Sequence, residues 1–186
     1  MKTELQKMLS SELYNAGDRQ LVEMRSSARQ LFSQYNLTSY DDSEKRTSIL
    51  TKLLGSYDGN IDIQAPFYCD YGCHIHVGKN VFMNFNCIIL DCAKVTLGDN
   101  VFMAPNVQLY TAYHPVIASE RIKGPENAAP ITIGNNVWLG GGVIVCPGVT
   151  IGDNTTIGAG SIVVHNIPAN VVAVGNPCKV VKKINQ

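Results

Sequence analysis

The sequence feature that most limits the fold is a strict six-residue period in the C-terminal half of the chain. Between residues 131 and 163 an aliphatic residue returns at every sixth position: Ile133, Leu139, Val145, Ile151, Ile157 and Val163. Two places before each stands a second inward candidate: Ile131, Val137, Val143, Val149, Thr155 and Ser161. Neither the helical period of about 3.6 residues nor simple strand alternation gives a repeat of six. A stack of triangular coils does, with one short strand and one corner per hexapeptide.

The same register occurs upstream, first in Val77, Met83 and Ile89, and after a slip of two residues in Leu97, Met103 and Leu109. Four of these strands are followed by glycine, one variable residue and asparagine, at Gly78–Asn80, Gly98–Asn100, Gly134–Asn136 and Gly152–Asn154. Glycine and asparagine tolerate positive-φ corners that a β-branched residue resists. We therefore predict a parallel β-helix over residues 57–186, in preference to an antiparallel sandwich with coincidental spacing.

Residues 1–56 have a helical period instead. One apolar stripe contains Leu5, Met8, Leu9 and Leu13, and a second contains Leu21, Met24, Ala28, Leu31, Phe32 and Tyr35. A third helix is expected to begin at Asp41 or Asp42, which are good N-caps, and to end at Gly55. Short amphipathic helices of this kind must pack on something larger. The sequence thus predicts a small N-terminal helical domain.

The six-residue count fails between the two sets of coils. Continued from Leu109, it would place Pro115, Arg121 and Asn127 in an apolar core. We therefore predict that residues 110–130, YTAYHPVIASERIKGPENAAP, leave the β-helix as a long protruding loop. Long excursions from a rigid scaffold usually carry function.

The composition excludes several partners. The chain has 15 basic and 15 acidic residues, so no basic excess favours nucleic acid. No apolar run reaches membrane-spanning length, and the polar start MKTELQKMLSSEL lacks the apolar centre of a secretion signal. The six cysteines are scattered and do not form a compact framework, which favours reduced thiols in the cytoplasm.

One cysteine-histidine cluster resembles a zinc site superficially. Cys69, Cys73, His74 and His76 lie close together, but no second pair follows at zinc-finger spacing. The two histidines also alternate with the strand residues Ile75 and Val77. We predict no metal site.

Histidine is the side chain whose ordinary pKa suits base catalysis at neutral pH. His74 and His76 lie in a strand pattern and His165 follows the last hexapeptide, whereas His114 lies on the protruding loop and is our candidate base. A cysteine nucleophile is the competing mechanism, but Cys87 occupies the inward string of a coil and is expected to be buried. The run Gly140-Gly141-Gly142 lets the backbone approach a ligand, so the Gly141 N–H is a candidate oxyanion donor.

Several strings of the chain together resemble one known family. They are NFNCIILD (84–91), APN (104–106), YTAYHP (110–115), ITIGNNVWLGGG (131–142), PGVTIGDN (147–154), IGAGSIV (157–163) and VGNPCKVV (174–181). The sequence resembles the maltose/galactoside O-acetyltransferases and their nodulation-factor relatives over nearly its whole length, including SELYNAGDRQL (11–21) of the leader. The resemblance implies a left-handed β-helix and a homotrimer with active sites between subunits. It also implies acetyl transfer from acetyl-CoA to a sugar hydroxyl.

The resemblance also implies roles for individual residues. His114 matches the catalytic histidine, and Asn84 matches a residue beside both acetyl donor and acceptor. Coenzyme A contacts are implied at Gly141, Ala159, Val164, His165, Lys179 and Lys182, and Lys183 extends this basic group. Acceptor contacts are implied at Arg25, Asp70, Phe82, Asp91 and Cys92.

The chain departs from the family pattern at three places. Val164 and His165 replace a threonine and a lysine, Cys92 replaces an aspartate of the galactoside branch, and the acidic Asp18 is displaced by two residues. These departures leave the acceptor open, so a hydroxylated antibiotic is the alternative to a sugar. A zinc carbonic anhydrase of γ type, which would need three convergent histidines, and a non-catalytic β-helix are the weaker alternatives.

Overall fold

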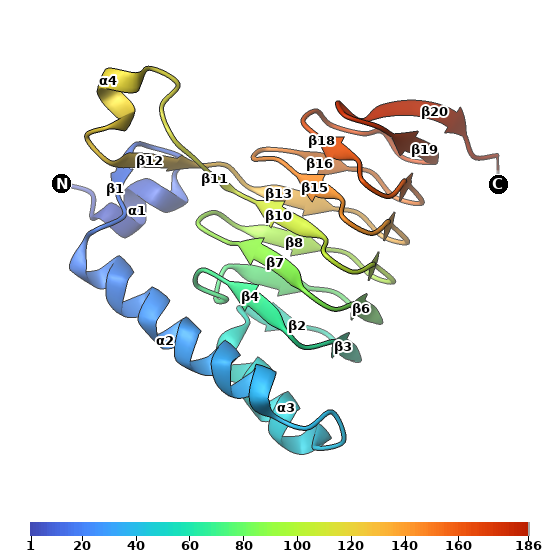
Figure 1. The fold of residues 1–186 in the computed structure, drawn as a ribbon, viewed down its shortest axis with the longest axis horizontal. Coiled ribbons are helices and arrows are strands. Elements are labelled where there is room, and N and C mark those ends of the chain that lie inside the picture. Colours follow the sequence, from blue (N-terminus) through green and yellow to red (C-terminus); the bar gives the residue numbers. More distant parts are fainter. Residues whose placement is uncertain (186) are drawn as a thin grey trace.

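The hexapeptide period folds into three parallel sheets wound as a β-helix, in a computed structural model that describes residues 1–185 (Figure 1). The first sheet contains β2 (Ser56–Tyr57), β5 (Ile75–Val77), β8 (Val95–Leu97), β13 (Ile131–Ile133) and β16 (Thr150–Ile151). The second contains β3 (Ile61–Ile63), β6 (Val81–Met83), β9 (Phe102–Met103), β14 (Trp138–Leu139), β17 (Thr156–Ile157), β19 (Val171–Val174) and the antiparallel β20 (Lys179–Lys183). The third contains β4 (Phe67–Cys69), β7 (Cys87–Leu90), β10 (Gln108–Tyr110), β15 (Ile144–Val145) and β18 (Ile162–Val163).

The pairing register confirms the six-residue period. Val95 pairs with Ile75 below it and with Ile131 above it, so equivalent inward residues stack from coil to coil. Every inward position identified from the period is buried, including the polar Thr155 and Ser161. The expected β-helix is therefore confirmed.

The corners between the first and second sheets show that glycine and asparagine have different tasks. Asn80, Asn100, Asn136 and Asn154 adopt the expected positive φ, and each side-chain amide bonds to the asparagine of the next coil, as from Asn136 to Asn154 at 2.8 Å. The preceding glycines do not adopt positive φ, contrary to the sequence expectation. They are needed for space, because a Cβ on Gly134 would lie 2.8 Å from the backbone nitrogen of Asp153.

Two of the three N-terminal helices, α2 (Arg19–Leu37) and α3 (Ser43–Leu53), cover the open end of the β-helix, and α1 (Glu4–Leu9) packs instead beside β1 (Tyr14–Asn15) and β12 (Pro125–Ala128) (Figure 1). Asp18 and Asp42 accept N-cap hydrogen bonds at the starts of α2 and α3. Tyr35 and Leu50 share one core with Phe67 of the first coil. The strand β2 begins at Ser56, so the expected boundary after residue 56 falls inside the first coil.

The chain leaves the coils after Thr111, as expected, but the excursion is ordered. Strands β11 (Ala112–Tyr113) and β12 (Pro125–Ala128) form an antiparallel hairpin, with the short helix α4 (Ala118–Arg121) at its tip. The leader strand β1 (Tyr14–Asn15) adds to β12 as a third strand. The sequence predicted a loop here because three short strands from distant segments leave no periodic signal.

Candidate active site

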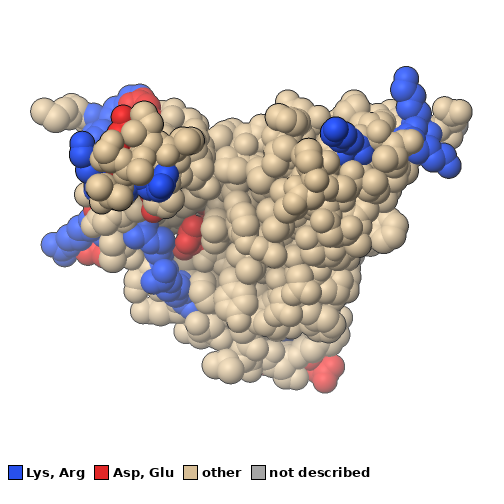
Figure 2. Space-filling view, turned by 45° about the horizontal axis from the view of Figure 1, so that its top comes forward, with Lys and Arg blue, Asp and Glu red and all other residues tan. Residues whose placement is uncertain are grey.

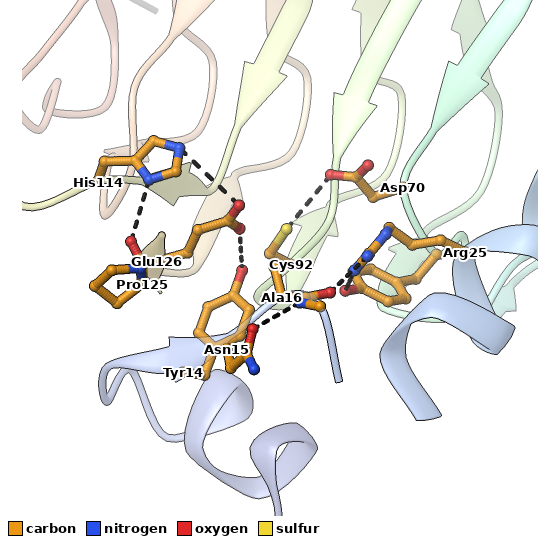
Figure 3. Close-up of polar contacts among 11 residues, drawn as sticks. Tyr14, Asn15, Ala16, Arg25, Asp70, Cys92, His114, Pro125 and Glu126 are labelled. Carbon is orange, nitrogen blue, oxygen red and sulfur yellow. Dashed lines mark hydrogen bonds and ion pairs between the residues drawn. The ribbon is translucent and has the colours of Figure 1, made fainter. Parts of the chain in front are cut away.

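A cavity of about 420 Å³ lies where the leader, the hairpin and the third sheet meet. Its lining mixes apolar residues with side chains of both charges: Ala16, Arg25, Arg29, Asp70, Leu90, Cys92, Ala112, His114 and Glu126. Four residues that were singled out from the sequence, Arg25, Asp70, Cys92 and His114, are thereby brought together. Figure 3 shows His114 and Glu126 on one side, Arg25 on the other, and the Cys92–Asp70 contact between them.

His114 follows β11 and is half exposed at the cavity edge. Its Nδ1 lies 3.1 Å from the Pro125 carbonyl oxygen, so we assign the ring proton to Nδ1, where it donates to that carbonyl. Nε2 then carries the lone pair and lies 4.0 Å from Oε1 of Glu126. An imidazole held in this tautomer can accept a proton at Nε2.

Glu126 is a cavity residue that the sequence did not indicate. It lies in β12 and is half-buried, and its Oε2 accepts a hydrogen bond of 2.8 Å from the Tyr14 hydroxyl (Figure 3). Its partners His114 and Tyr14 belong to the hairpin and to the leader. Only the pairing of β1 with β12 brings them together, and neither strand has a pattern that reveals its partner.

The other side of the cavity is formed by Arg25 and Asp70. The Arg25 guanidinium donates to the Tyr71 hydroxyl and to the Ala16 carbonyl, both at 2.6 Å. The Cys92 thiol donates to Oδ2 of Asp70 at 3.4 Å. Burial raises the pKa of Asp70, and the neighbouring Asp91 adds to the rise, whereas the Cys92 hydrogen bond and Arg25 oppose it.

Asp91 does not reach this cavity, contrary to the role implied for it. Its side chain is fully buried, and its carboxylate accepts backbone N–H groups of Asp70, Tyr71 and His74 at 2.8–3.2 Å. Burial raises its pKa, although these hydrogen bonds oppose the rise. Asp91 therefore holds the turn that carries Asp70 and is not free to contact an acceptor.

Four further predicted site residues lie at or beside a different corner of the β-helix. Asn84 and Phe82 line a separate, mostly apolar hollow with Phe102, Met103, Ala104 and Trp138. Gly141 and Ala159 lie at successive corners of the same edge, where Gly142 donates to Pro105 O and Gly160 donates to Gly141 O. This edge joins the second and third sheets, whereas the hairpin with His114 leaves the edge that joins the third sheet to the first. A single copy of the chain thus separates Asn84 from His114.

The basic residues implied for coenzyme A lie near the C-terminal end of the coils. Lys179, Lys182 and Lys183 belong to β20 and are exposed, as are Val164 and His165 after β18. Figure 2 shows basic side chains at this end of the molecule, separated from the charged leader region by a broad face with almost no charge.

The cysteines are poorly suited to nucleophilic attack. Burial raises the pKa of all six thiols, to about 11 for Cys73 and Cys87. Cys87 is fully buried, and its thiol faces the Ala104 carbonyl oxygen. A thiolate is the reactive form of cysteine, so none of these groups is activated.

Within residues 1–185, no three histidine, cysteine or acidic side chains converge as a metal site would require. The two histidines of the superficial zinc pattern have other partners, since His74 Nδ1 lies 2.7 Å from Asp91 O and His76 Nδ1 lies 2.9 Å from Ser56 Oγ. Over the same residues, no helix combines the length and apolarity needed to cross a membrane.

Two family models match the chain: the maltose acetyltransferase hexapeptide capping motif over residues 7–59, and the bacterial transferase hexapeptide (six repeats) over residues 130–165. A putative acetyltransferase of Saccharomyces cerevisiae is 50% identical over 98% of this chain and 93% of its own length. The structure of a maltose O-acetyltransferase from Clostridium difficile 630 is 52% identical with a TM-score of 0.96, covering 100% of this chain and 99% of the other. A galactoside acetyltransferase in complex with coenzyme A is 42% identical with a TM-score of 0.96, covering 100% of this chain and 92% of the other.

Proposed function

Because this chain belongs to the maltose/galactoside O-acetyltransferase family of hexapeptide-repeat enzymes, we propose that it moves acetyl from acetyl-CoA to a sugar hydroxyl with His114 as general base. The chain is an acyltransferase. The observation that carries the finer proposal is His114 itself, which lines the cavity with Arg25 and Asp70 and has its Nδ1 bonded to Pro125 O. The side chains of Arg25 and Asp70 suit hydroxyl groups.

In the proposed reaction, His114 Nε2 takes the proton of the acceptor hydroxyl as its oxygen attacks the thioester carbonyl of acetyl-CoA. The resulting imidazolium lies beside the Glu126 carboxylate, which stabilises the new positive charge. When the tetrahedral intermediate collapses, the C–S bond breaks and the coenzyme A thiolate takes the proton from His114. The products are the acetyl ester and free coenzyme A.

The oxyanion of the tetrahedral intermediate needs a fixed hydrogen-bond donor. We assign this role to the Gly141 N–H, for which no backbone carbonyl of residues 1–185 serves as acceptor. The absence of a side chain at this corner leaves room for a ligand, since the nearest atom to a Cβ added at Gly141 would be Pro105 O at 3.5 Å. Asn84 lies on the same edge and would contact the donor and the acceptor.

Direct transfer is favoured over an acetyl-thioenzyme. Cys87 and Cys92 are buried, and burial raises the pKa of both thiols. His114 in the cavity can activate the acceptor hydroxyl directly, so no covalent intermediate on the protein is required. The thiols are unpaired, which suits the reducing cytoplasm, where we place the reaction.

The separation of His114 from Asn84 supports a site shared between copies of the chain. We propose a homotrimer in which the edge with Asn84, Gly141 and Ala159 of one copy faces the His114 cavity of the next. The apolar hollow beside Asn84 exposes Phe102 and Trp138 by about half, a surface that an adjacent subunit would cover. The nearly uncharged face in Figure 2 suits the same contact.

Coenzyme A is proposed to lie along the upper coils toward the C-terminus. Ala159, Val164 and His165 would follow its pantetheine arm, and the exposed Lys179 and Lys182 would bind its phosphates, with Lys183 beside them. The acceptor is proposed to contact Arg25, Asp70, Phe82 and Cys92. The cavity carries both signs of charge, which favours a neutral polyhydroxyl molecule over an ionic one.

A coenzyme A release assay over a panel of sugars and hydroxylated antibiotics tests the proposal. We expect acetyl-CoA-dependent turnover with a hexose or disaccharide, and its loss in His114→Ala. Turnover with an antibiotic and none with any sugar would overturn the assignment of the acceptor. Sugar turnover that persists in His114→Ala would overturn the assignment of the base.

A further inference from the structure

The Tyr14 side chain of the leader is buried between the two sides of the cavity. It is 2% exposed and packs with Tyr71, Cys92 and Ala128 in a small core separate from that of the coils. Its hydroxyl donates to Oε2 of Glu126 at 2.8 Å, and its backbone pairs with Glu126 in the β1–β12 ladder. Figure 3 shows the tyrosine hydroxyl directed at the Glu126 carboxylate, with Cys92 to one side of it.

We propose that Tyr14 is a positioning residue for acetyl transfer, so that the leader completes the active site as well as covering the coils. Tyr14 fixes one oxygen of Glu126 and thereby directs the other toward His114. This inference rests on the proposed role of His114 as base, but it concerns a residue that has no role in that proposal.

The geometry gives the hydrogen bond a definite direction and consequence. Burial raises the pKa of Tyr14, and the proximity of Cys92 and Glu126 adds to the rise, so the phenol remains a proton donor. Oε2 of Glu126 accepts the hydrogen bond from the Tyr14 hydroxyl. The other carboxylate oxygen, Oε1, then lies 4.0 Å from His114 Nε2. Without the anchor, a half-buried carboxylate at the cavity edge would rotate toward water.

The main chain around Tyr14 is itself held on both sides. The Asn15 N–H donates to Glu4 Oε2 at 2.6 Å, and the Gly17 N–H donates to Asn15 Oδ1 at 2.9 Å. Arg25, across the cavity, donates to Ala16 O at 2.6 Å. The turn that presents Tyr14 is therefore connected to α1, to α2 and to the hairpin, which is more support than a surface strand of two residues requires.

Tyr14 also lies beside the acceptor side of the cavity. Cys92, its neighbour in the small core, donates to Asp70 Oδ2. A series of neighbouring groups thus runs from His114 through Glu126, Tyr14 and Cys92 to Asp70. In a buried network of this kind, removing one polar group changes the effect of removing its neighbour. A double-mutant cycle measures this coupling.

A double-mutant cycle separates positioning from simple packing. Tyr14→Phe keeps the ring and removes the hydroxyl, and Glu126→Ala removes the group through which Tyr14 is proposed to act. In the wild-type background we expect Tyr14→Phe to lower kcat about tenfold, the size expected for one hydrogen bond to a charged group, with the KM for acetyl-CoA unchanged. In the Glu126→Ala background the same change should alter kcat by less than about twofold.

Tyr35→Phe is the matched control. The Tyr35 hydroxyl also makes a buried hydrogen bond, to Ile63 O at 2.6 Å, but it lies in the core beneath α2 and α3 and does not line the cavity. We expect this variant to lower the Tm and to keep kcat within about twofold of wild type. An equal loss of kcat from Tyr14→Phe in both backgrounds, or an unchanged kcat, would overturn the proposal.

A second readout requires no acceptor. The ring ¹⁵N signals of His114, assigned by their loss in His114→Ala, report its protonation and hydrogen bonding. Tyr14→Phe and Glu126→Ala should shift these signals in the same direction, and Tyr35→Phe should leave them in place. Unshifted signals in Tyr14→Phe would refute positioning. If wild type releases no coenzyme A with any acceptor while the signals shift as expected, the proposed function fails and the coupling stands.

If Tyr14→Phe does not fold, 3,5-difluorotyrosine incorporated at position 14 keeps the ring and the hydroxyl but changes the donor strength. Shifted His114 ring signals would then support the proposal, and unshifted signals would overturn it.

Discussion

The coils and the cavity of this enzyme are built from contacts of opposite kinds. Each inward residue of the coils pairs with equivalents one coil away, as Ile133 does with Leu97 and Ile151. The cavity depends on single contacts between distant segments, such as the hydrogen bond from Tyr14 to Glu126 across 112 residues. Repeated contacts supply stability, and single contacts place the reactive groups.

The difference extends to charge and water. The inward positions of the hexapeptide period are apolar, apart from Thr155 and Ser161, whose hydroxyls bond to backbone carbonyls. The cavity instead gathers Arg25, Asp70, His114 and Glu126 around open space. A change of an inward coil residue should therefore reduce stability at constant specific activity, and a change of a cavity residue should reduce specific activity at nearly constant stability.

The largest expected effect is on turnover. His114→Ala should lower kcat by about 10²–10⁴-fold, the usual contribution of a general base, because His114 is the one histidine among the described residues that line the cavity. Steady-state coenzyme A release measures it. His76→Gln is the control, because His76 lies in the first sheet and bonds to Ser56. Similar losses of kcat in both variants would show that a histidine of the coils matters to turnover as much as the histidine of the cavity.

The next effect is on stability. Ile133→Ala should lower the free energy of unfolding by about 2–5 kcal/mol, because it leaves a cavity among buried neighbours in adjacent coils. Denaturant titration measures the loss, and kcat per folded protein should stay near wild type. A large loss of kcat in the folded fraction would show that the inward residues of the coils also affect the chemistry.

A smaller effect is expected at Glu126. Glu126→Gln keeps an acceptor for the Tyr14 hydroxyl but removes the negative charge that faces His114. We expect kcat to fall about tenfold, because the imidazolium formed during transfer loses its counter-charge. The KM for acetyl-CoA should not change. A change in that KM with kcat intact would place Glu126 in donor binding instead.

The smallest effect is expected at the lysines of β20. Lys179→Ala with Lys182→Ala should raise the KM for acetyl-CoA and leave the acceptor KM unchanged, at about 1 kcal/mol for each exposed contact. Added salt should shrink the difference from wild type, because it screens the same attraction. An acetyl-CoA KM equal to that of wild type would mean that these lysines are only a solvated face.

The coils could be predicted from the sequence because their signal is local and repeated. The period alone identified Ile131 and Val163 as inward residues, and both are buried. The prediction that the corner glycines adopt positive φ was wrong. These positions require glycine because the next coil approaches closely, and the residue preferences of turns do not report such an approach. The N-cap of α3 at Asp42 was likewise predicted from a local signal.

The cavity could be predicted only in part. The failed six-residue count located the excursion that carries His114, and the family resemblance supplied Arg25 and Asp70. Glu126 and Tyr14 were missed because their meeting depends on a three-stranded pairing between leader and hairpin. Asp91 was assigned to acceptor contact because its position matches the family pattern, but such a match does not show whether a side chain is buried. Here Asp91 is buried, and its carboxylate accepts hydrogen bonds from backbone N–H groups.

The central claim is that the cavity of one copy is completed by the coil corner of another. Mixing His114→Ala with Asn84→Ala subunits and reassembling them tests it directly. Each variant alone should be nearly inactive, and a random equal mixture should regain about one quarter of wild-type turnover, since half of the copies supply each intact residue independently. Recovery no greater than the sum of the two separate variants would contradict the shared site.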